Sequence, residues 1–221
     1  MKRALVIGSS GGIGSALSEA LSEQGWQVTG LSRSHNGLDV TSEASVAEHL
    51  DSLEGPFQRI LIATGALEIN GHTPEKALKH LSADALGAQF ALNTIGPALV
   101  MKHALRLLPR DEPSVMAALS ARVGSIGDNR AGGWHSYRAS KAALNQIIRG
   151  AAIEIGRTHR EAVCVALHPG TVATKFTEKY LGRHPAVPPA EAAQNLLQVI
   201  DSLTPEQSGA FFDWAGKPVP W

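Results

Sequence analysis

The sequence predicts a doubly wound α/β fold, in which a parallel β-sheet carries helices on both faces. The first observation is that short β-rich runs alternate with longer helical patterns along the whole chain. The second is that these strands are continuously apolar and are separated by segments long enough for helical crossovers, as in a sheet covered on both faces. The third is that no internal repeat, low-complexity tract or linker interrupts the pattern, so we expect residues 1–221 to form a single domain.

The expected elements, taken in order, fill the chain from end to end. Strands are expected at residues 4–8, 27–32, 59–63, 114–120, 162–168 and 209–212. Helices are expected at residues 13–24, 42–53, 83–108, 137–157 and 190–203, and residues 38–40 are a candidate for one further short strand. We expect a cofactor-binding half at about residues 1–110 and a catalytic and substrate-binding half at about residues 111–221.

Composition argues against several classes of protein. Apolar residues make up 43% of the 221 positions, which is enough for a hydrophobic core. Lys plus Arg and Asp plus Glu number 20 each and no basic stripe occurs, so we expect no nucleic-acid partner. No run of about 18 apolar residues occurs, so we expect no membrane span. The single cysteine, Cys164 in an expected strand, favours the reducing environment of the cytoplasm.

A glycine-rich turn joins the first expected strand to the first expected helix. Gly8, Gly12 and Gly14 lie in the segment Gly-Ser-Ser-Gly-Gly-Ile-Gly. Glycine lets the backbone turn sharply and approach a pyrophosphate closely, and the helix that begins there directs free N–H groups and its positive dipole end at the phosphates. We therefore expect a dinucleotide to bind at this turn, although glycines also simply end strands.

A tyrosine and a lysine lie four residues apart at the start of a long expected helix. Tyr137 and Lys141 share a face of that helix, so the phenol and the ammonium can point at one reacting centre. A phenol has an ordinary pKa of about 10, and a nearby cation favours its ionised form. This spacing alone also arises by chance, so its meaning depends on the other motifs.

Taken together, the motifs resemble those of the short-chain dehydrogenase/reductase family, in the same order and over nearly the whole chain. They are the glycine turn, Asp39 in Leu38-Asp39-Val40, Ala63-Thr64-Gly65 as a loose form of an N-A-G element, Asn93, the Tyr137/Lys141 pair, and Pro169-Gly170-Thr171-Val172-Ala173-Thr174. Within the family, residues 124–129, Gly132-Gly133 and Tyr137-Arg138 resemble the branch of sniffer-type carbonyl reductases and C-factor.

The resemblance implies a Rossmann-like fold and an oxidoreductase that uses a nicotinamide cofactor. It implies that Asp39 lies next to the adenine, that residues 169–174 hold the nicotinamide, and that Asn93 anchors a water that relays protons to Lys141. The expected cofactor-binding residues are Gly8, Ser10, Gly12, Ile13, Gly14, Ser32, Arg33, Asp39, Val40, Ala63, Thr64, Gly65, Asn93, Tyr137, Lys141, Pro169, Gly170, Val172 and Thr174.

The sequence departs from the family at the catalytic serine. The serine usually ends the strand before the tyrosine as the second member of a Ser-Ser pair, and Ala121 stands there. Two nearby hydroxyls are candidates to replace it. Ser120 would need a bulge or twist to face Tyr137, because neighbouring side chains of a strand point in opposite directions, and Ser125 lies twelve residues before the tyrosine. Either serine can instead bond its own backbone, so the choice among Ser125, Ser120 and neither stays open.

The end of the second expected strand favours NADP over NAD. An NAD-preferring enzyme usually places an Asp or Glu here to bond the ribose hydroxyls, whereas this chain has Ser32 followed by Arg33. A guanidinium suits the oxygens of a 2′-phosphate and can stack on adenine. The alternative is that Arg33 is a solvated loop residue.

We expect a carbonyl reductase that moves a hydride between the nicotinamide and a small carbonyl or alcohol substrate. Tyr137 would act as general acid, Lys141 would lower its pKa and hold the ribose, a serine would bond the carbonyl oxygen, and Trp134 and His135 are candidates for the substrate pocket. The alternatives are a nucleotide-binding signalling or redox-sensing module with little turnover and a structural subunit of an assembly. The intact Tyr137 and Lys141 favour the enzyme.

Two further expectations concern metals and assembly. No Cys/His cluster has the spacing of a metal site, so no metal is expected. The two long helices are richer in apolar residues than a solvent-facing layer requires, at Leu99, Val100, Leu144, Ile147 and Ile148. Since closed symmetric oligomers are common, we expect a homodimer or homotetramer.

Overall fold

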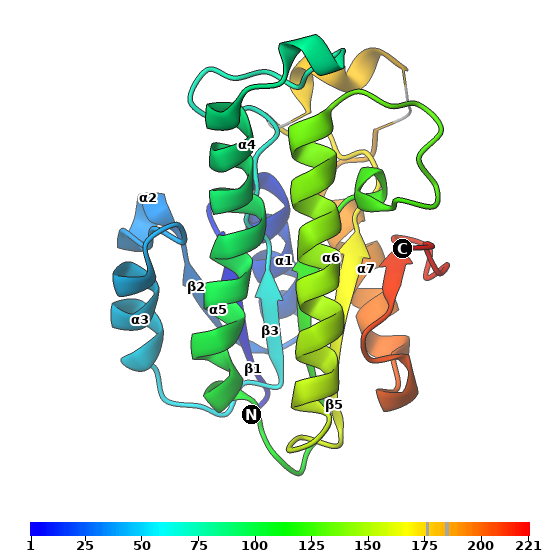
Figure 1. Cartoon of the computed structure of the whole chain (residues 1–221). Helices are drawn as coiled ribbons and strands as arrows, with labels where there is room; N and C mark the ends of the chain where they lie inside the picture. The colour runs from blue at the N-terminus through cyan, green and yellow to red at the C-terminus, as the bar shows by residue number, and fades with distance from the viewer. Residues whose placement is uncertain (176, 184–185) are drawn as a thin grey trace.

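The computed structural model describes residues 1–175, 177–183 and 186–221 and has the expected doubly wound α/β architecture (Figure 1). In this described part, six parallel strands form one sheet: β1 (Arg3–Ile7), β2 (Gln27–Leu31), β3 (Arg59–Ile62), β4 (Ser114–Leu119), β5 (Ala162–His168) and β6 (Phe211–Asp213). Their spatial order is β2-β1-β3-β4-β5-β6. The chain changes direction across the sheet between β1 and β3, and ligands bind at such a switch point, outside the carboxyl ends of the strands.

Helices cover both faces of the sheet. One face carries α1 (Gly12–Glu23) and α7 (Pro189–Ser202), and the other carries α3 (Glu43–Asp51), α4 (Ala83–Phe90), α5 (Gly96–Ala104) and α6 (His135–Ile155). Strand β1 shows why its apolar run is continuous: Ala4 and Val6 pack in one core layer, whereas Leu5 and Ile7 pack in the other. None of the described helices is long and apolar enough to cross a bilayer.

The long helix expected at residues 83–108 is a chain of helical segments. A π-helical turn at Ala91–Ile95 separates α4 from α5, and a 3-10 turn at Leu105–Leu107 follows. The π turn contains Asn93, and π-bulges inside helices occur frequently at functional sites. The hydroxyl of Thr94 donates a hydrogen bond to the backbone oxygen of Ser140 at 2.7 Å, which fixes this turn against α6.

The expectation of a strand at residues 38–40 is wrong. Ser32 caps a short helix, α2 (Arg33–Asn36), and Gly37 ends that helix with a φ of 81°. The backbone N–H of Asp39 donates to the hydroxyl of Ser45 at 3.0 Å and so is not available to a strand ladder. Leu38 and Val40 are buried in the core from an irregular loop. Other short helical turns lie at Leu78–His80, Arg122–Gly124, Glu178–Arg183 and Pro205–Gln207.

Candidate active site

The glycine-rich turn packs so closely that Gly8 and Gly14 have no room for a side chain. A Cβ on Gly14 would lie 2.1 Å from the backbone oxygen of Gly8, and a Cβ on Gly8 would lie 3.0 Å from the carbonyl of Ala63. Gly8 also has a φ of 88°, in the region that favours glycine. The N-cap of α1, Gly11, supplies no capping side chain, which leaves the first-turn N–H groups without that partner and suits an anion there.

The second glycine of the turn connects it to the loop after β5. A Cβ on Gly12 would lie 2.6 Å from Cγ2 of Thr174, so these two expected cofactor residues are in contact across the carboxyl edge of the sheet. Gly170 in the same loop has a φ of 78° and packs under Trp214. Val172 forms a bridge with Val187, which anchors the loop to the segment before α7.

A cleft of about 490 Å³ opens beside the turn, at the switch point between β1 and β3. It brings together expected cofactor residues from four segments, namely Gly8, Ser10, Ser32, Arg33, Asp39, Val40, Ala63, Thr64 and Gly65. The hydroxyl of Thr64 is buried in this wall and has no hydrogen-bond partner among the described residues. A buried polar group without a partner is costly, so a ligand oxygen or nitrogen would stabilise it.

The charged residues of the cleft lie at its outer end. Arg33 is exposed in the first turn of α2, and Ser32 beneath it is buried, with its hydroxyl accepting a hydrogen bond from the N–H of His35. The carboxylate of Asp39 accepts bonds from the hydroxyl and the N–H of Thr41 at 2.7 and 2.9 Å. These bonds, helped by the charge of Arg33, hold the pKa of Asp39 below its ordinary value. The cleft therefore presents one cation and one carboxylate.

Tyr137 and Lys141 lie together in the first two turns of α6, and both are buried. The ammonium nitrogen of Lys141 is 5.9 Å from the centre of the Tyr137 ring and donates to the backbone oxygen of Leu119 at 2.9 Å. Burial lowers the pKa of Lys141 to about 8. Burial also raises the pKa of Tyr137, which outweighs the lowering expected from the nearby cation, so the phenol is held in its protonated form.

Asn93 and Lys141 approach the cleft from two different helices. A Cβ on Gly65 would lie 2.9 Å from Oδ1 of Asn93 and 3.3 Å from Nζ of Lys141, so Gly65 lies between them. The Asn93 amide exchanges hydrogen bonds of 3.0 and 2.9 Å with the backbone of Ala66, and it donates to Oε1 of Gln89. The Asn93 side chain thus holds the loop after β3 against the π turn.

The two candidate serines have different hydrogen-bond partners. Ser120 donates to Oδ1 of Asn145 at 2.6 Å and is buried against α6. The hydroxyl of Ser125 accepts from the N–H of Asp128 at 3.0 Å. Gly124 packs against Lys141, because a Cβ there would lie 2.7 Å from the Lys141 Cβ, so Ser125 follows directly on a contact with α6. The proton of Ser120 is therefore engaged within the fold, whereas the hydroxyl of Ser125 accepts a hydrogen bond from a backbone N–H.

An aromatic wall stands above Tyr137. Trp134, a candidate for the substrate pocket from the sequence, meets the ring of Tyr137 edge-on at 6.3 Å and the ring of Tyr180 at 5.5 Å. The Tyr180 hydroxyl donates to Glu68 at 2.8 Å, and Lys179 pairs with the same carboxylate at 2.6 Å. The sequence analysis missed Tyr180 and Glu68 because they are 112 positions apart and no motif joins them.

A third missed residue, Glu75, caps helix α6. Glu75 is buried, and its carboxylate accepts hydrogen bonds from the backbone N–H and from the hydroxyl of Ser136, next to Tyr137. No group of three or more His, Cys, Asp or Glu side chains in the described part could hold a metal ion. The chemistry available is a glycine cradle for a dinucleotide beside a buried proton donor and cation, as in a hydride-transferring oxidoreductase.

Comparison with known proteins agrees with this arrangement. A family model described as enoyl-(acyl carrier protein) reductase matches residues 31–210. The chain is 31% identical over 236 residues to 1-hydroxy-2-glutathionyl-2-methyl-3-butene dehydrogenase of Rhodococcus sp. (strain AD45), covering 100% of both chains. It is 37% identical over 132 residues to C-signal of Myxococcus xanthus, covering 60% of this chain and 76% of the relative.

The fold is similar to that of a solved carbonyl reductase. The carbonyl reductase Sniffer of D. melanogaster superposes with a TM-score of 0.83 at 20% identity, covering 100% of both chains. The chain belongs to the short-chain dehydrogenase/reductase family and is an oxidoreductase of that type. The family resemblance expected from the sequence motifs is confirmed.

Proposed function

We propose that this oxidoreductase reduces the carbonyl group of a small molecule with NADPH, and that Tyr137 is its proton donor. The observation that carries the proposal is the buried Tyr137/Lys141 pair beside Gly65, which itself lines the dinucleotide cleft. Burying a phenol and an ammonium costs free energy, and buried groups with perturbed pKa values beside a cleft are candidates for catalysis.

The residues of the cleft fit a dinucleotide. The turn at Gly8, Gly12 and Gly14 leaves backbone N–H groups open at the start of α1, where a pyrophosphate would bind. The unsatisfied hydroxyl of Thr64 lies in the same wall, where it would bond a ribose or phosphate oxygen. Ser10, Ile13, Val40 and Ala63 would complete the cradle, and residues Pro169, Gly170, Val172 and Thr174 would hold the nicotinamide end.

The proton chemistry follows from the states of the two buried groups. When bound, the cofactor supplies a hydride to the carbonyl carbon. Tyr137, kept protonated by burial, donates its proton to the carbonyl oxygen as negative charge develops there. The ammonium of Lys141 stabilises the phenolate that remains, and donors beyond the one engaged by Leu119 can hold ribose hydroxyls. Asn93, beside Gly65, would anchor the water that returns a proton through Lys141.

Ser125 is the better of the two serine candidates. A hydroxyl that polarises a carbonyl oxygen must have a proton to donate, and Ser120 already gives its proton to Asn145. Ser125 accepts from Asp128, so its own proton can be given to the substrate oxygen. The position after Gly124, which packs on Lys141, also brings Ser125 toward the reacting pair.

The preference for NADP rests on the outer end of the cleft. Arg33 is exposed on the lining of the cleft, and the position before it holds the uncharged Ser32. A 2′-phosphate there would gain a charge-assisted bond and meet no carboxylate on that residue. Asp39, whose hydrogen bonds with Thr41 keep it ionised, would face the adenine.

Assembly and location remain part of the proposal. Val100, Leu144 and Ile148, used above to expect an oligomer, are in fact core residues of this chain. Ile147 is exposed instead, together with Ile95 and Ile153 on the same helical layer. We propose a homodimer or homotetramer through this smaller apolar surface, in the cytoplasm, with no nucleic-acid or membrane partner.

The test is to follow NADPH consumption by the purified chain over a panel of ketones and aldehydes. The reverse reaction is tested with an alcohol that carries a glutathione thioether. The relative from Rhodococcus that matches over the full length of both chains is named for such a substrate. Turnover that depends on Tyr137 supports the proposal. Tight NADPH binding without turnover of any panel member would favour a signalling module instead, and stronger binding of NADH would overturn the cofactor assignment.

A further inference from the structure

The start of helix α6 lacks a cap of its own. Its N-cap residue, Trp134, has a left-handed backbone (φ 51°, ψ 38°) and supplies no capping side chain. Free N–H groups at a buried helix start need acceptors from elsewhere. The acceptor comes from the loop between β3 and α4, 61 positions earlier in the chain.

Glu75 provides that cap. Its carboxylate accepts from the backbone N–H of Ser136 at 3.2 Å and from the Ser136 hydroxyl. Its backbone oxygen also accepts from the N–H of Trp134 at 2.6 Å. One residue therefore holds the helix start at the position before Tyr137 and at the residue whose ring packs on Tyr137.

The electrostatics favour an ionised carboxylate at this position. Burial raises the pKa of Glu75, but the hydrogen bonds, chiefly from the Ser136 side chain, and the charge of His135 outweigh it, so the pKa lies below its ordinary value. A negative charge also interacts favourably with the positive end of a helix. Moving the carboxylate away from its donors would leave a buried charge without compensation, which is costly, so the contact limits movement of the helix start.

The loop that contains Glu75 also contains Glu68, which binds Tyr180. Figure 1 shows this segment, the start of α6 and the short helix Glu178–Arg183 gathered at one end of the molecule. Trp134 stands between Tyr137 and Tyr180 with edge-on contacts to both. A shift of Glu75 would therefore move the reacting phenol and the aromatic wall together.

We propose that Glu75 is a positioning residue for the reduction, acting through Ser136 to hold the Tyr137 hydroxyl and the Trp134 ring in their reactive arrangement. This inference rests on the proposed role of Tyr137. A cap that served stability alone would change the melting temperature but not the turnover of the folded enzyme. A positioning residue changes kcat, because misplacing a reacting group costs rate even in a folded protein.

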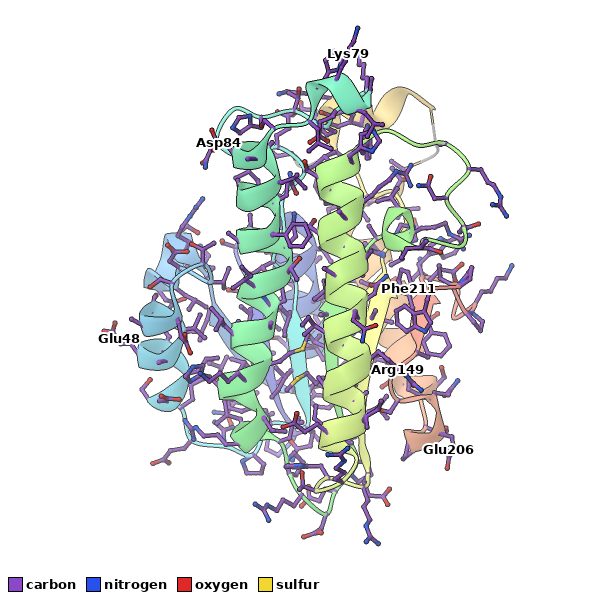
Figure 2. The ribbon with its side chains drawn as sticks, in the orientation of Figure 1. Glu48, Lys79, Asp84, Arg149, Glu206 and Phe211 are labelled. Carbon is purple, nitrogen blue, oxygen red and sulfur yellow. The ribbon has the colours of Figure 1, made fainter. Side chains whose placement is uncertain are left out.

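The experiment compares Glu75→Gln, Ser136→Ala and the double variant with Asp84→Asn and Tyr137→Phe. Asp84 is an exposed carboxylate in the first turn of the neighbouring α4, where it projects outward (Figure 2), and so it is a matched control. For each variant we would measure kcat and KM for the carbonyl substrate at saturating NADPH, NADPH affinity by fluorescence, and melting temperature. Assays are run well below the lowest melting temperature.

We expect Glu75→Gln to lower kcat by about 10- to 100-fold while NADPH affinity stays within about twofold of the unmodified enzyme. Ser136→Ala should lower kcat by a similar factor. The double variant should be no slower than the slower single variant, because the two groups act through one contact. Asp84→Asn should behave as the unmodified enzyme does.

Unchanged kcat in Glu75→Gln and Ser136→Ala, with only a lower melting temperature, would overturn the inference and leave Tyr137 as the proton donor. Multiplicative losses in the double variant would also overturn it, since they would show independent roles. If Glu75→Gln does not fold, Ser136→Ala, which keeps the carboxylate, decides the question alone. Full activity of Tyr137→Phe would overturn both this inference and the proposed function.

Discussion

The glycine turn beside the cleft and the cluster of buried side chains around Tyr137 lie at the same edge of one sheet, yet they are built from different groups. The first is formed largely by backbone: a Cβ on Gly14 or Gly8 would collide with neighbouring main chain. The second is formed by buried side chains that bond one another across long sequence distances, such as Glu75 with Ser136. A backbone site is thus sensitive to added atoms, whereas a side-chain site is sensitive to removed ones.

The largest effect should come from removing one atom in the side-chain site. Tyr137→Phe deletes the phenolic oxygen and leaves the ring packed against Trp134, so the fold and the cofactor cleft should persist. We expect kcat to fall by about 10²- to 10⁴-fold, the range for general acid catalysis. Steady-state rates and NADPH titration measure the two properties. Turnover like that of the unmodified enzyme would contradict the assignment.

The matching experiment on the backbone site adds one atom. Gly14→Ala places a Cβ where the structure allows only 2.1 Å to the Gly8 oxygen, so the turn must open. We expect NADPH affinity to fall by about 100-fold or more, with a loss of about 1–3 kcal/mol in the free energy of unfolding. Gly25→Ala is the control for stability loss away from the cleft, because Gly25 has a left-handed backbone (φ 81°) that strains an alanine but has no atom within 4 Å of its Cβ position. Equal NADPH affinity in the two variants would refute the close-packed cradle.

Arg33→Ala tests the expected charged contact between the cleft and the 2′-phosphate of NADPH. A charged hydrogen bond is worth about 1.5–3 kcal/mol, so NADPH should bind about 10- to 100-fold more weakly while NADH changes little. Titration of the variant with both cofactors measures the difference. The same loss for both cofactors would mean that Arg33 does not recognise the 2′-phosphate.

Alanine variants of Ser125 and Ser120 should differ in their effects on kcat and on melting temperature. Ser125→Ala should lower kcat by about tenfold, because it removes a donor to the carbonyl oxygen. Ser120→Ala should lower the melting temperature more than the rate, since its hydroxyl bonds Asn145 inside the fold. The reverse ranking in kcat would assign the donor to Ser120, and unchanged rates in both variants would leave neither serine in the reaction.

The smallest effect at neutral pH concerns the protonation of Lys141. Burial lowers its pKa to about 8 from 10.5, so kcat/KM for reduction should fall by half near pH 8 and continue to fall above it as the ammonium is lost. Stability should respond in the opposite sense. Between the two pKa values the unfolded chain binds more protons than the folded one, so the contribution of Lys141 to the unfolding free energy rises with pH in that window.

Rate profiles and denaturant titrations over this range measure both trends. Lys141→Met is the control, because it lacks the titrating group and should lose the pH-dependent rise in stability. A kcat/KM profile that stays flat through the alkaline range would show that Lys141 keeps its proton in the free enzyme.

Much of this protein could be predicted from the sequence because the relevant signals are local. Apolar runs and helical patterns predicted the parallel sheet. The spacing of Gly8, Gly12 and Gly14 predicted a tight turn, and in the structure a Cβ at any of these glycines would crowd neighbouring atoms. Tyr137 and Lys141 share a helix face because they are one turn apart. Each of these signals depends on residues a few positions apart, so it can be read from the sequence alone.

Tertiary structure decided the features that depend on distant partners. Residues 38–40 do not form the expected strand because the hydroxyl of Ser45 accepts a hydrogen bond from the N–H of Asp39, and the hydroxyl of Ser120 donates to Asn145 of α6. Burial, which no residue type reveals by itself, reversed the expected direction of the Tyr137 pKa. Glu75 caps the start of α6 although it lies 61 positions before Ser136 in the chain. Contacts at such distances exist only when the fold brings the segments together, because no short-range pattern in the chain encodes them.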